Sequence, residues 1–187
     1  MARPRKFERD AALEIAIRLF WTRGYEQTTM SDLRLAMGIG RQSLYSTFGD
    51  KEQLFHEAFE RYKARAFVWI NALLHMPDPG EGLHAYFDKL ANGLTDDPDR
   101  AGCLIFNTFV EQGAAGPLGQ RGVEAFNLAF SETLSRAHEM GMASGSIEEQ
   151  ALSLVSATAG MVALSRGGYS KMQLKGIGRL ALAGIGL

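Results

Sequence analysis

Residues 28–48 read TTMSDLRLAMGIGRQSLYSTF, and this stretch predicts two short helices joined by a glycine turn. Apolar residues recur at helical spacing on both sides of Gly38-Ile39-Gly40: Met30, Leu33, Ala36 and Met37 before it, and Leu44, Tyr45 and Phe48 after it. Thr29 is a good N-cap for the first helix, with Asp32 three residues on. The pattern is that of a helix-turn-helix motif over about residues 29–48.

The outward positions of the second helix carry hydrogen-bonding side chains suited to phosphates and to base edges in a major groove. These positions are Arg41, Gln42, Ser43, Ser46 and Thr47. Gln42 is the preferred base reader because its amide can pair with adenine. Spacing alone leaves open a second interpretation, a helical hairpin in a plain α-helical protein.

The composition is that of an ordinary globular protein: 187 residues, 46% hydrophobic and 22% charged. The net charge of -1 excludes a polybasic nucleic-acid binder, but the charge is unevenly divided. Residues 1–65 hold 12 Lys and Arg against 9 Asp and Glu, whereas the remainder holds 8 against 12. The modest basic excess therefore lies with the helix-turn-helix.

A single cysteine, Cys103, excludes an internal disulfide and any multi-cysteine zinc site. We interpret it as a small buried hydrophobic residue rather than a redox sensor. The four histidines have no ligand spacing, so neither a metal site nor a cofactor is expected. No secretory signal and no apolar run of membrane-spanning length is apparent. We expect a soluble cytoplasmic protein without a membrane partner.

Helical spacing continues along the chain, and no stretch alternates like a strand. A first helix is expected over about Phe7 to Arg23. The basic residues Arg3 to Lys6 before it predict either an arm along DNA phosphates or a solvated tail. Later helices are expected at Gly82–Leu94, Ala101–Gln112, Leu118–Met142, Ile147–Arg166 and Lys171–Leu187.

A long helix is predicted from about Lys51 to His75, ending before Pro77 and Pro79. Asp50 is expected to cap it, with Gln53 answering as a capping box. Its length would be roughly 37 Å at 1.5 Å per residue. Such a helix can connect the DNA-reading end rigidly to a second domain.

Taken together, the motif, the Thr28-Thr29 opening, the segment GIGRQSLYSTFGDKEQLF at residues 38–55 and the all-helical remainder resemble the tetracycline-repressor (TetR) family of transcriptional regulators. The resemblance is strong over about residues 7–59 and architectural beyond them. It implies phosphate contacts for Thr29 and Lys51 and a DNA-backbone contact for Tyr45, which from its pattern alone could equally belong to the core. Gly40 departs from the family, which usually has Ser or another capping residue there.

The resemblance further implies a cavity for a small hydrophobic effector inside the second, aromatic-rich domain. Its expected lining residues are Phe87, Leu90, Cys103, Phe106, Asn107, Phe109, Phe126 and Phe130. Most of these side chains would fill the core in any helical protein. Glu111 lies four residues after Asn107 and could point into the cavity, or it could lie at the solvated end of its helix.

The last two helices carry apolar residues on more than one face, which predicts both a core and a partner. In the family, the final two helices of each subunit form a four-helix dimer interface. The expected interface residues are Ala151, Leu154, Thr158, Met161, Ile177 and Ala181. A second apolar stripe on the helix expected at Ile147–Arg166 contains Leu152, Val155, Ala159 and Val162.

These observations predict an all-α protein of about nine helices, with a DNA-binding domain at residues 1–50 and an effector-binding and dimerisation domain at residues 51–187. The predicted function is that of a homodimeric repressor that leaves a pseudo-palindromic operator in double-stranded DNA when a small hydrophobic effector binds. The alternative is a helical small-molecule-binding or adaptor protein that uses the motif for protein contacts. No motif of a hydrolase, P-loop, zinc protease or dinucleotide-binding enzyme occurs, so an enzyme is not expected.

Overall fold

The computed structural model describes residues 4–187, with side chains from Arg9 onward except that of Ala114. Within this range the chain forms nine α-helices and a short 3-10 turn at Gly113–Ala115, with no strand. The helices are α1 (Pro4–Arg23), α2 (Met30–Met37), α3 (Arg41–Phe48), α4 (Lys51–Leu74), α5 (Pro79–Asp96), α6 (Leu104–Gln112), α7 (Pro117–Glu139), α8 (Ile147–Arg166) and α9 (Lys171–Ala183). The all-helical prediction is confirmed.

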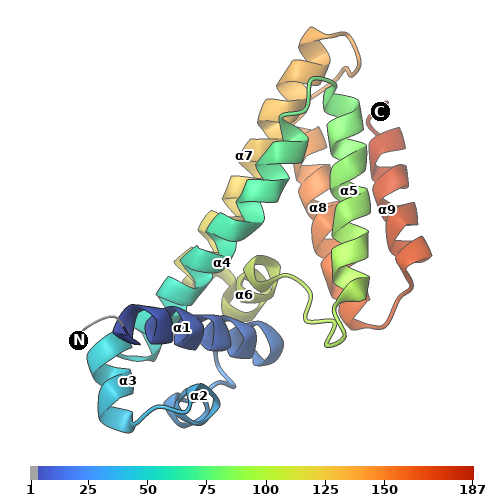
Figure 1. Ribbon diagram of the computed structural model, residues 1–187. Helices are drawn as coiled ribbons and strands as arrows, with labels where there is room; N and C mark the ends of the chain where they lie inside the picture. The colour runs from blue at the N-terminus through green and yellow to red at the C-terminus, as the bar shows by residue number, and fades with distance from the viewer. Residues whose placement is uncertain (1–3) are drawn as a thin grey trace.

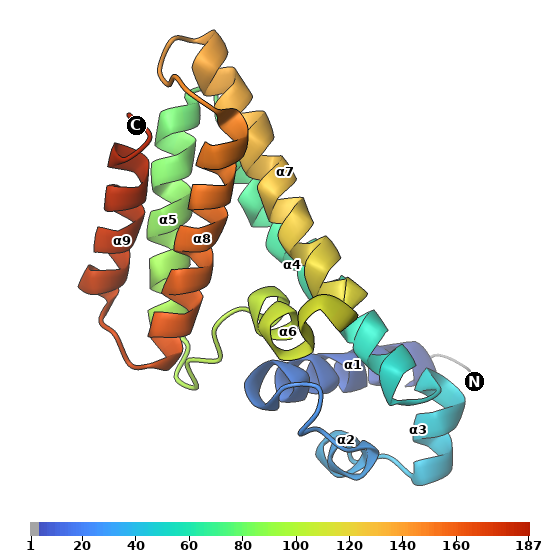
Figure 2. The same cartoon turned by 180° about the vertical axis from the view of Figure 1, so that it is seen from behind.

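The helices are arranged in two groups that are bridged by α4 and α7 (Figure 1). The first group, α1, α2 and α3, gathers around the beginning of α4, and the second group places α5, α8 and α9 side by side. Seen from behind, α6 lies between the groups, next to α1 (Figure 2). The motif is therefore held at one end of the molecule.

Helix α1 packs one apolar face, including Ala16 and Phe20, onto α4. The rings of Phe20 and Phe55 meet edge to face with centroids 4.9 Å apart. The predicted N-terminal arm is wrong in part, because the backbone from Pro4 to Lys6 forms the first turn of α1. Arg3, the first residue of that predicted arm, lies outside the described residues.

Helix α4 spans 24 residues, about 36 Å at ~1.5 Å per residue. Asp50 caps it, accepting a hydrogen bond from the Gln53 amide at 2.9 Å. The predicted reciprocal bond from the Gln53 side chain is not made, so the cap is only half of a capping box. Phe55 near its beginning and Leu74 at its end are both buried, which fixes α4 in both groups of helices.

Several predicted boundaries are wrong, although the order of the helices is right. Pro79 begins α5 rather than separating it from α4, because Asp78 supplies the cap and proline is tolerated in a first turn. Helix α6 starts at Leu104, three residues later than expected from Ala101. Helices α7 and α9 end earlier than predicted, at Glu139 and Ala183.

The buried apolar side chains form one continuous core from α1 to α9. At Gly178 of α9 an added Cβ would lie 2.6 Å from the Phe87 Cβ, so glycine allows α9 to approach α5 closely. A continuous core does not by itself mark a domain boundary. The division at residue 50 therefore stays a prediction.

Candidate nucleic-acid interface and effector cavity

Helix α2 begins with a complete capping box formed by Thr29 and Asp32. The Thr29 hydroxyl oxygen accepts from the Asp32 amide at 3.1 Å, and the Asp32 carboxylate accepts from the Thr29 amide at 2.9 Å. The Thr29 side chain and then its amide, both donating to this carboxylate, hold the pKa of Asp32 below its usual value. Thr29 is exposed, so the first turn of α2 faces solvent.

Gly38 ends α2 in the left-handed conformation, with φ 67°. Gly40 then precedes α3 as its N-cap and offers no side-chain hydrogen bond. Because glycine is accepted at an N-cap, α3 still forms over Arg41–Phe48. The turn is therefore built from two glycines, one required by backbone conformation and one lacking the usual polar cap.

Helix α3 buries Leu44 and Phe48 and exposes the predicted DNA-facing positions. The exposed residues include Arg41, Gln42, Ser43, Tyr45, Ser46 and Thr47. Tyr45 is 43% exposed, and the Arg41 guanidinium lies 5.8 Å from its ring centroid. The Ser46 hydroxyl donates to the Ser43 carbonyl at 3.1 Å, so its own donor is already used.

A groove of about 540 Å³ separates α2 from α3 at this surface. Arg34 of α2 and Arg41 of α3 both line it, together with Ser31 and Tyr45. The spacing of the motif does not indicate Arg34 or Ser31, because both lie on the first helix and face the second only after the two helices pack. Both basic groups are placed where a phosphate backbone could lie between the helices.

Lys51 lies at the beginning of α4 and is held against the turn between α1 and α2. Its ammonium lies 3.4 Å from the Glu26 carbonyl oxygen and 4.2 Å from the Tyr25 ring centroid. This position is close to the helix-turn-helix but is not free of internal contacts. A phosphate contact at Lys51 stays a prediction.

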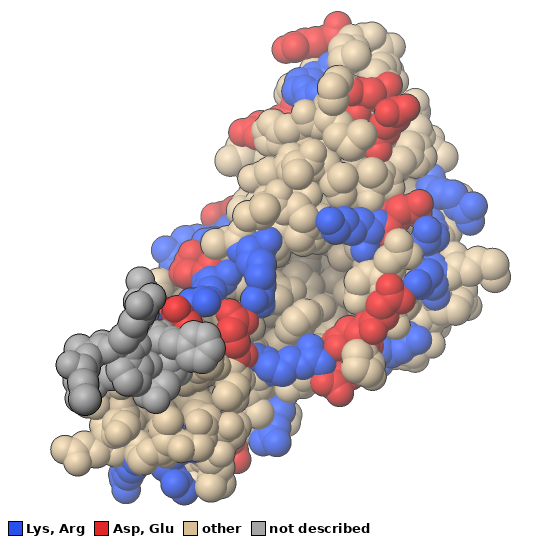
Figure 3. Space-filling view, in the orientation of Figure 1, with Lys and Arg blue, Asp and Glu red and all other residues tan. Residues whose placement is uncertain are grey.

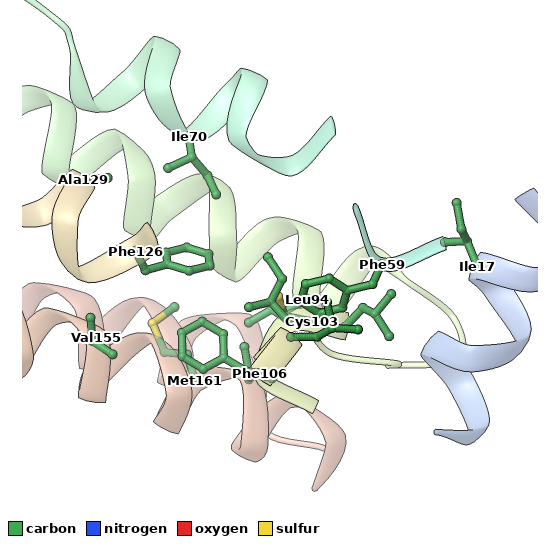
Figure 4. Close-up of a cluster of buried hydrophobic side chains, with 14 of the residues drawn as sticks. Ile17, Phe59, Ile70, Leu94, Cys103, Phe106, Phe126, Ala129, Val155 and Met161 are labelled. Carbon is green, nitrogen blue, oxygen red and sulfur yellow. The ribbon is translucent and has the colours of Figure 1, made fainter. Parts of the chain in front are cut away.

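A cavity of about 220 Å³ is lined by residues of α1, α4, α5, α6, α7 and α8. Of the predicted lining residues, Leu90, Cys103, Phe106 and Phe126 line it. Figure 4 shows Cys103, Leu94 and Phe106 lying together near the beginning of α6. The effector role of these residues stays a prediction, but the space is present.

The other predicted lining residues lie elsewhere. Phe87 and Phe130 are buried behind Tyr86, with ring centroids 5.1 and 5.2 Å from its own. Asn107 donates to the Ala101 carbonyl at 2.7 Å and lines an adjoining cleft, which shares Trp21, Phe106 and Val162 with the cavity. Phe109 is 38% exposed and lies outside the lining.

Sequence reasoning missed four prominent lining residues. Tyr62 and Trp69 extend from α4, Lys89 from α5, and Trp21 from the end of α1. Tyr62, Ala66, Trp69 and Ile70 recur at helical spacing, so the face of the long helix was detectable. The place of Trp21 in the lining could not be predicted from the sequence, because it depends on how α1 packs against α6.

Three protonated side chains stand in or around this cavity. Burial raises the pKa of the Cys103 thiol, and it raises the pKa values of the Tyr62 and Tyr86 hydroxyls. Tyr62 and Cys103 interact with each other, and Tyr86 lies 3.2 Å from the Thr158 hydroxyl oxygen. These groups are neutral near pH 7.

Four of the predicted dimer-interface residues are in the wrong place for a partner. Ala151, Leu154, Thr158 and Met161 are fully or almost fully buried in the core of the subunit itself. Ile177 and Ala181 of α9 are half-buried against the same core. In the second stripe Leu152 is 60% exposed, but Val155 and Val162 are buried, so neither predicted stripe faces outward as a whole.

Among residues 4–187 no group of three or more His, Cys, Asp and Glu side chains is placed to hold a metal ion. No helix in that range has the length and apolar character needed to cross a membrane.

A model of the bacterial regulatory proteins of the tetR family matches residues 12–58, which include α2 and α3. The HTH-type transcriptional repressor ComR of Escherichia coli is 39% identical over 107 residues, which cover 56% of this chain and 51% of ComR. The match thus spans about half the length of that relative.

The uncharacterized HTH-type transcriptional regulator YezE of Bacillus subtilis is 34% identical over 151 residues, covering 78% of this chain and 77% of YezE. A structure of the TetR family transcriptional regulator CifR, a cysteine mutant in complex with 26-bp operator DNA, superposes with a TM-score of 0.84. It is 26% identical and covers 94% of this chain and 95% of its own. The chain therefore belongs to the tetR family of bacterial regulatory proteins.

Proposed function

We propose that this protein is a homodimeric transcriptional repressor in the cytoplasm, released from its operator by a small hydrophobic effector. The observation that carries the proposal is one path of contacts between the cavity and the helix-turn-helix. Helix α6 forms that path: Cys103 and Phe106 at its beginning line the cavity, and Glu111 near its end reaches the α1–α2 turn.

The DNA-reading part of the proposal rests on α3. Its apolar residues are buried and its polar residues are exposed, so a duplex can reach Gln42 without unfolding the motif. Family membership and the operator complex of CifR support the same role. Two motifs in a dimer would enter successive major grooves, about 34 to 36 Å apart along the duplex.

The dimer would form through the exposed face of α8 and α9 rather than through the buried stripe. Leu152, Met172 and Leu180 leave large apolar side chains in solvent on these two helices. Gly160 and Gly176 have no neighbouring atom within 4 Å of an added Cβ, which leaves room for close helix approach. Burying such a face against a second copy removes apolar surface from water.

Effector binding would act on the DNA-binding end through Trp21 and through α6. Trp21 of α1 is itself a wall of the cavity, and its indole N–H donates to the Gly102 carbonyl at 3.1 Å. A ligand that displaces Trp21 or α6 would shift α1 and alter the spacing of the two motifs. A coupling free energy of about 1 to 3 kcal/mol would weaken DNA binding roughly 5 to 150-fold.

The test is a mobility-shift titration with the promoter regions that flank the gene. We expect a salt-sensitive, sequence-specific complex at nanomolar dimer. Alanine at Tyr45 or Lys51 should abolish retention of DNA while leaving the dimer intact, as measured by light scattering. If both variants retain DNA like the wild type, Tyr45 and Lys51 are not DNA contacts. If the wild type itself forms no specific complex, the alternative of a small-molecule-binding or adaptor protein gains instead.

A further inference from the structure

Of the described residues, those lining the 220 Å³ cavity carry a positive charge and no negative charge. Its walls are mostly aromatic and aliphatic, and Lys89 is its one charged lining residue in the part of the chain that the structure describes. Figure 3 shows the hollow open to solvent on this face, with Lys and Arg as well as Asp and Glu side chains around its rim. A ligand in this cavity would therefore meet one ammonium group and no carboxylate in the lining.

Lys89, the charged residue of the lining, makes no side-chain hydrogen bond to another described residue, whereas the hydroxyl groups of the cavity do. The Thr158 hydroxyl donates to the Leu154 carbonyl at 2.9 Å, so the Tyr86 hydroxyl donates to Thr158. The Tyr62 hydroxyl interacts with Cys103. The acidic groups nearest in sequence to Lys89 are engaged elsewhere: Asp88 pairs with Lys175 and Asp96 with Lys171.

Within the described residues Lys89 has no carboxylate partner; its ammonium instead lies 5.2 Å from the Trp69 ring centroid. An ammonium at the edge of an aromatic cavity can donate a charge-assisted hydrogen bond to an anionic group of a ligand. It would lose little by doing so, because a cation–π contact at an exposed site is worth only about 0.5 to 1 kcal/mol. The ligand's anionic end is thus expected at the α5 side of the cavity.

The same features disfavour a cationic ligand. Aromatic walls often hold ammonium ligands through cation–π contacts, but both tryptophans here already have a cation from the protein. Lys89 lies over Trp69, and the Arg18 guanidinium lies 5.2 Å from the Trp21 ring centroid. Arg18 is in turn paired with Asp97 and Asp99, so it is not available to a ligand anion.

We infer that the effector is a small aromatic monocarboxylate, with its ring among the cavity aromatics and its carboxylate on Lys89. That this ligand controls DNA binding rests on the proposed function. That it binds in the cavity does not. The cavity is smaller than the roughly 300 to 1,000 Å³ typical of drug-sized ligands, which limits the ring system to one or two rings.

The test uses two matched sets of probes that differ only in charge: phenylacetate, phenylacetamide and phenethylamine, and naphthalene-1-acetate with its amide and the corresponding naphthylethylamine. Calorimetric titrations at pH 7.5 compare the wild type with Lys89→Met, which keeps the stem on Trp69 but removes the charge. Lys89→Arg restores the charge. Lys63→Met is the matched control, because Lys63 pairs with Glu60 and does not line the cavity.

In the wild type, at least one carboxylate should bind about tenfold more tightly than its amide, with the amine weakest. Lys89→Met should remove this preference while leaving amide affinity within about twofold, and Lys89→Arg should restore it. Equal affinities in the wild type, tightest binding of an amine, or a preference that survives in Lys89→Met would overturn the inference. So would the absence of binding by all six probes at about 1 mM.

Mobility shifts of the same variants separate this inference from the proposed function. Lys89→Met should bind operator DNA like the wild type, because Lys89 is remote from α3 in the chain of contacts. A carboxylate preference without any DNA binding would contradict the proposed repressor and leave the ligand class standing. DNA binding without a carboxylate preference would contradict the ligand class alone.

Discussion

The Glu111 carboxylate, near the end of α6, accepts hydrogen bonds from the backbone amides of Tyr25 at 2.9 Å and Glu26 at 2.8 Å. Tyr25 and Glu26 lie in the turn between α1 and α2, so one side chain joins the cavity-lining helix to the DNA-binding end. Both interpretations of Glu111 drawn from the sequence hold in part. The residue is exposed near the end of α6, and with Asn107 it lines the cleft beside Trp21 rather than the 220 Å³ cavity.

Removing this junction should weaken both stability and coupling. We expect Glu111→Ala to lower the free energy of unfolding by about 1 kcal/mol, because two backbone amides exchange a carboxylate for water. The melting temperature should fall by about 2 to 4 °C. Glu111→Gln should lie between, since an amide oxygen still accepts one of the bonds.

Thermal unfolding and effector-induced release from DNA measure these two effects separately. Glu124→Gln, on the exposed face of α7, is the matched control and should change neither. If Glu111→Ala unfolds like the wild type and is released from DNA to the same extent, the junction has no part in coupling.

Gln42 is the residue of α3 for which base reading is predicted most sharply. Gln42→Ala should weaken operator binding by about 1 to 3 kcal/mol and relax specificity at one base pair. Ser46→Ala is the comparison, with a smaller expected loss, because the Ser46 hydroxyl already donates to the Ser43 carbonyl. Binding measured across a set of single-base operator variants distinguishes them; a uniform loss over all variants would assign Gln42 to the phosphate backbone instead.

The exposed face of α8 and α9 should govern dimer formation. Leu152→Asp and Leu180→Asp are expected to give monomers in light scattering, because each places a charge in a surface that must become dry. Leu128→Asp on α7 is a close control, since Leu128 and Leu152 are both 60% exposed. If the α8 variant and the α9 variant both remain dimeric, the dimer interface lies on another surface.

Stability should decrease in alkaline solution. Burial raises the folded-state pKa values of Cys103, Tyr62 and Tyr86 above their ordinary values of 9.0 for the thiol and 10.0 for the two phenols. As pH rises through those ordinary values, the unfolded chain loses protons that the folded chain keeps, which favours unfolding. The contribution of these three protonated groups to the free energy of unfolding is therefore intact below about pH 9 and is lost progressively above it.

Denaturant unfolding between about pH 7 and 10.5 measures this decline. Cys103→Ala should reduce the slope near pH 9 by removing one of the titrating groups. The native thiol should also react slowly with iodoacetamide at pH 7.5, because it is protonated and buried, and should react readily in denaturant. Stability that is constant or increasing above pH 9 contradicts the burial of these three groups.

Local sequence signals were sufficient for the motif and insufficient for the cavity and interface. The Thr29 cap, the glycine turn and the burial of Leu44 and Phe48 depend on neighbours within a few residues, and all three are as predicted. Lys89 and Trp21 lie 68 positions apart and line one cavity only because α1 and α5 both pack against α4. No periodicity within a single helix carries that information.

The error at the dimer interface has a similar cause. The sequence predicts two apolar stripes on α8, one for a partner and one for the core, yet both contain buried residues: Leu154 and Met161 in the first, Val155 and Val162 in the second. Thr158 looked suited to an interface, yet it is buried because Tyr86 of α5 supplies a hydrogen-bond partner. The assignment required the position of α5, which the pattern of α8 does not contain.

The most direct test of ligand-controlled DNA binding is an operator titration followed by fluorescence anisotropy, with and without a saturating aromatic carboxylate identified by the calorimetric series. The account predicts a specific complex whose affinity falls about 5 to 150-fold when the carboxylate is bound, and a smaller fall in Glu111→Ala. An affinity for operator that is unchanged by a ligand shown to occupy the cavity would contradict it.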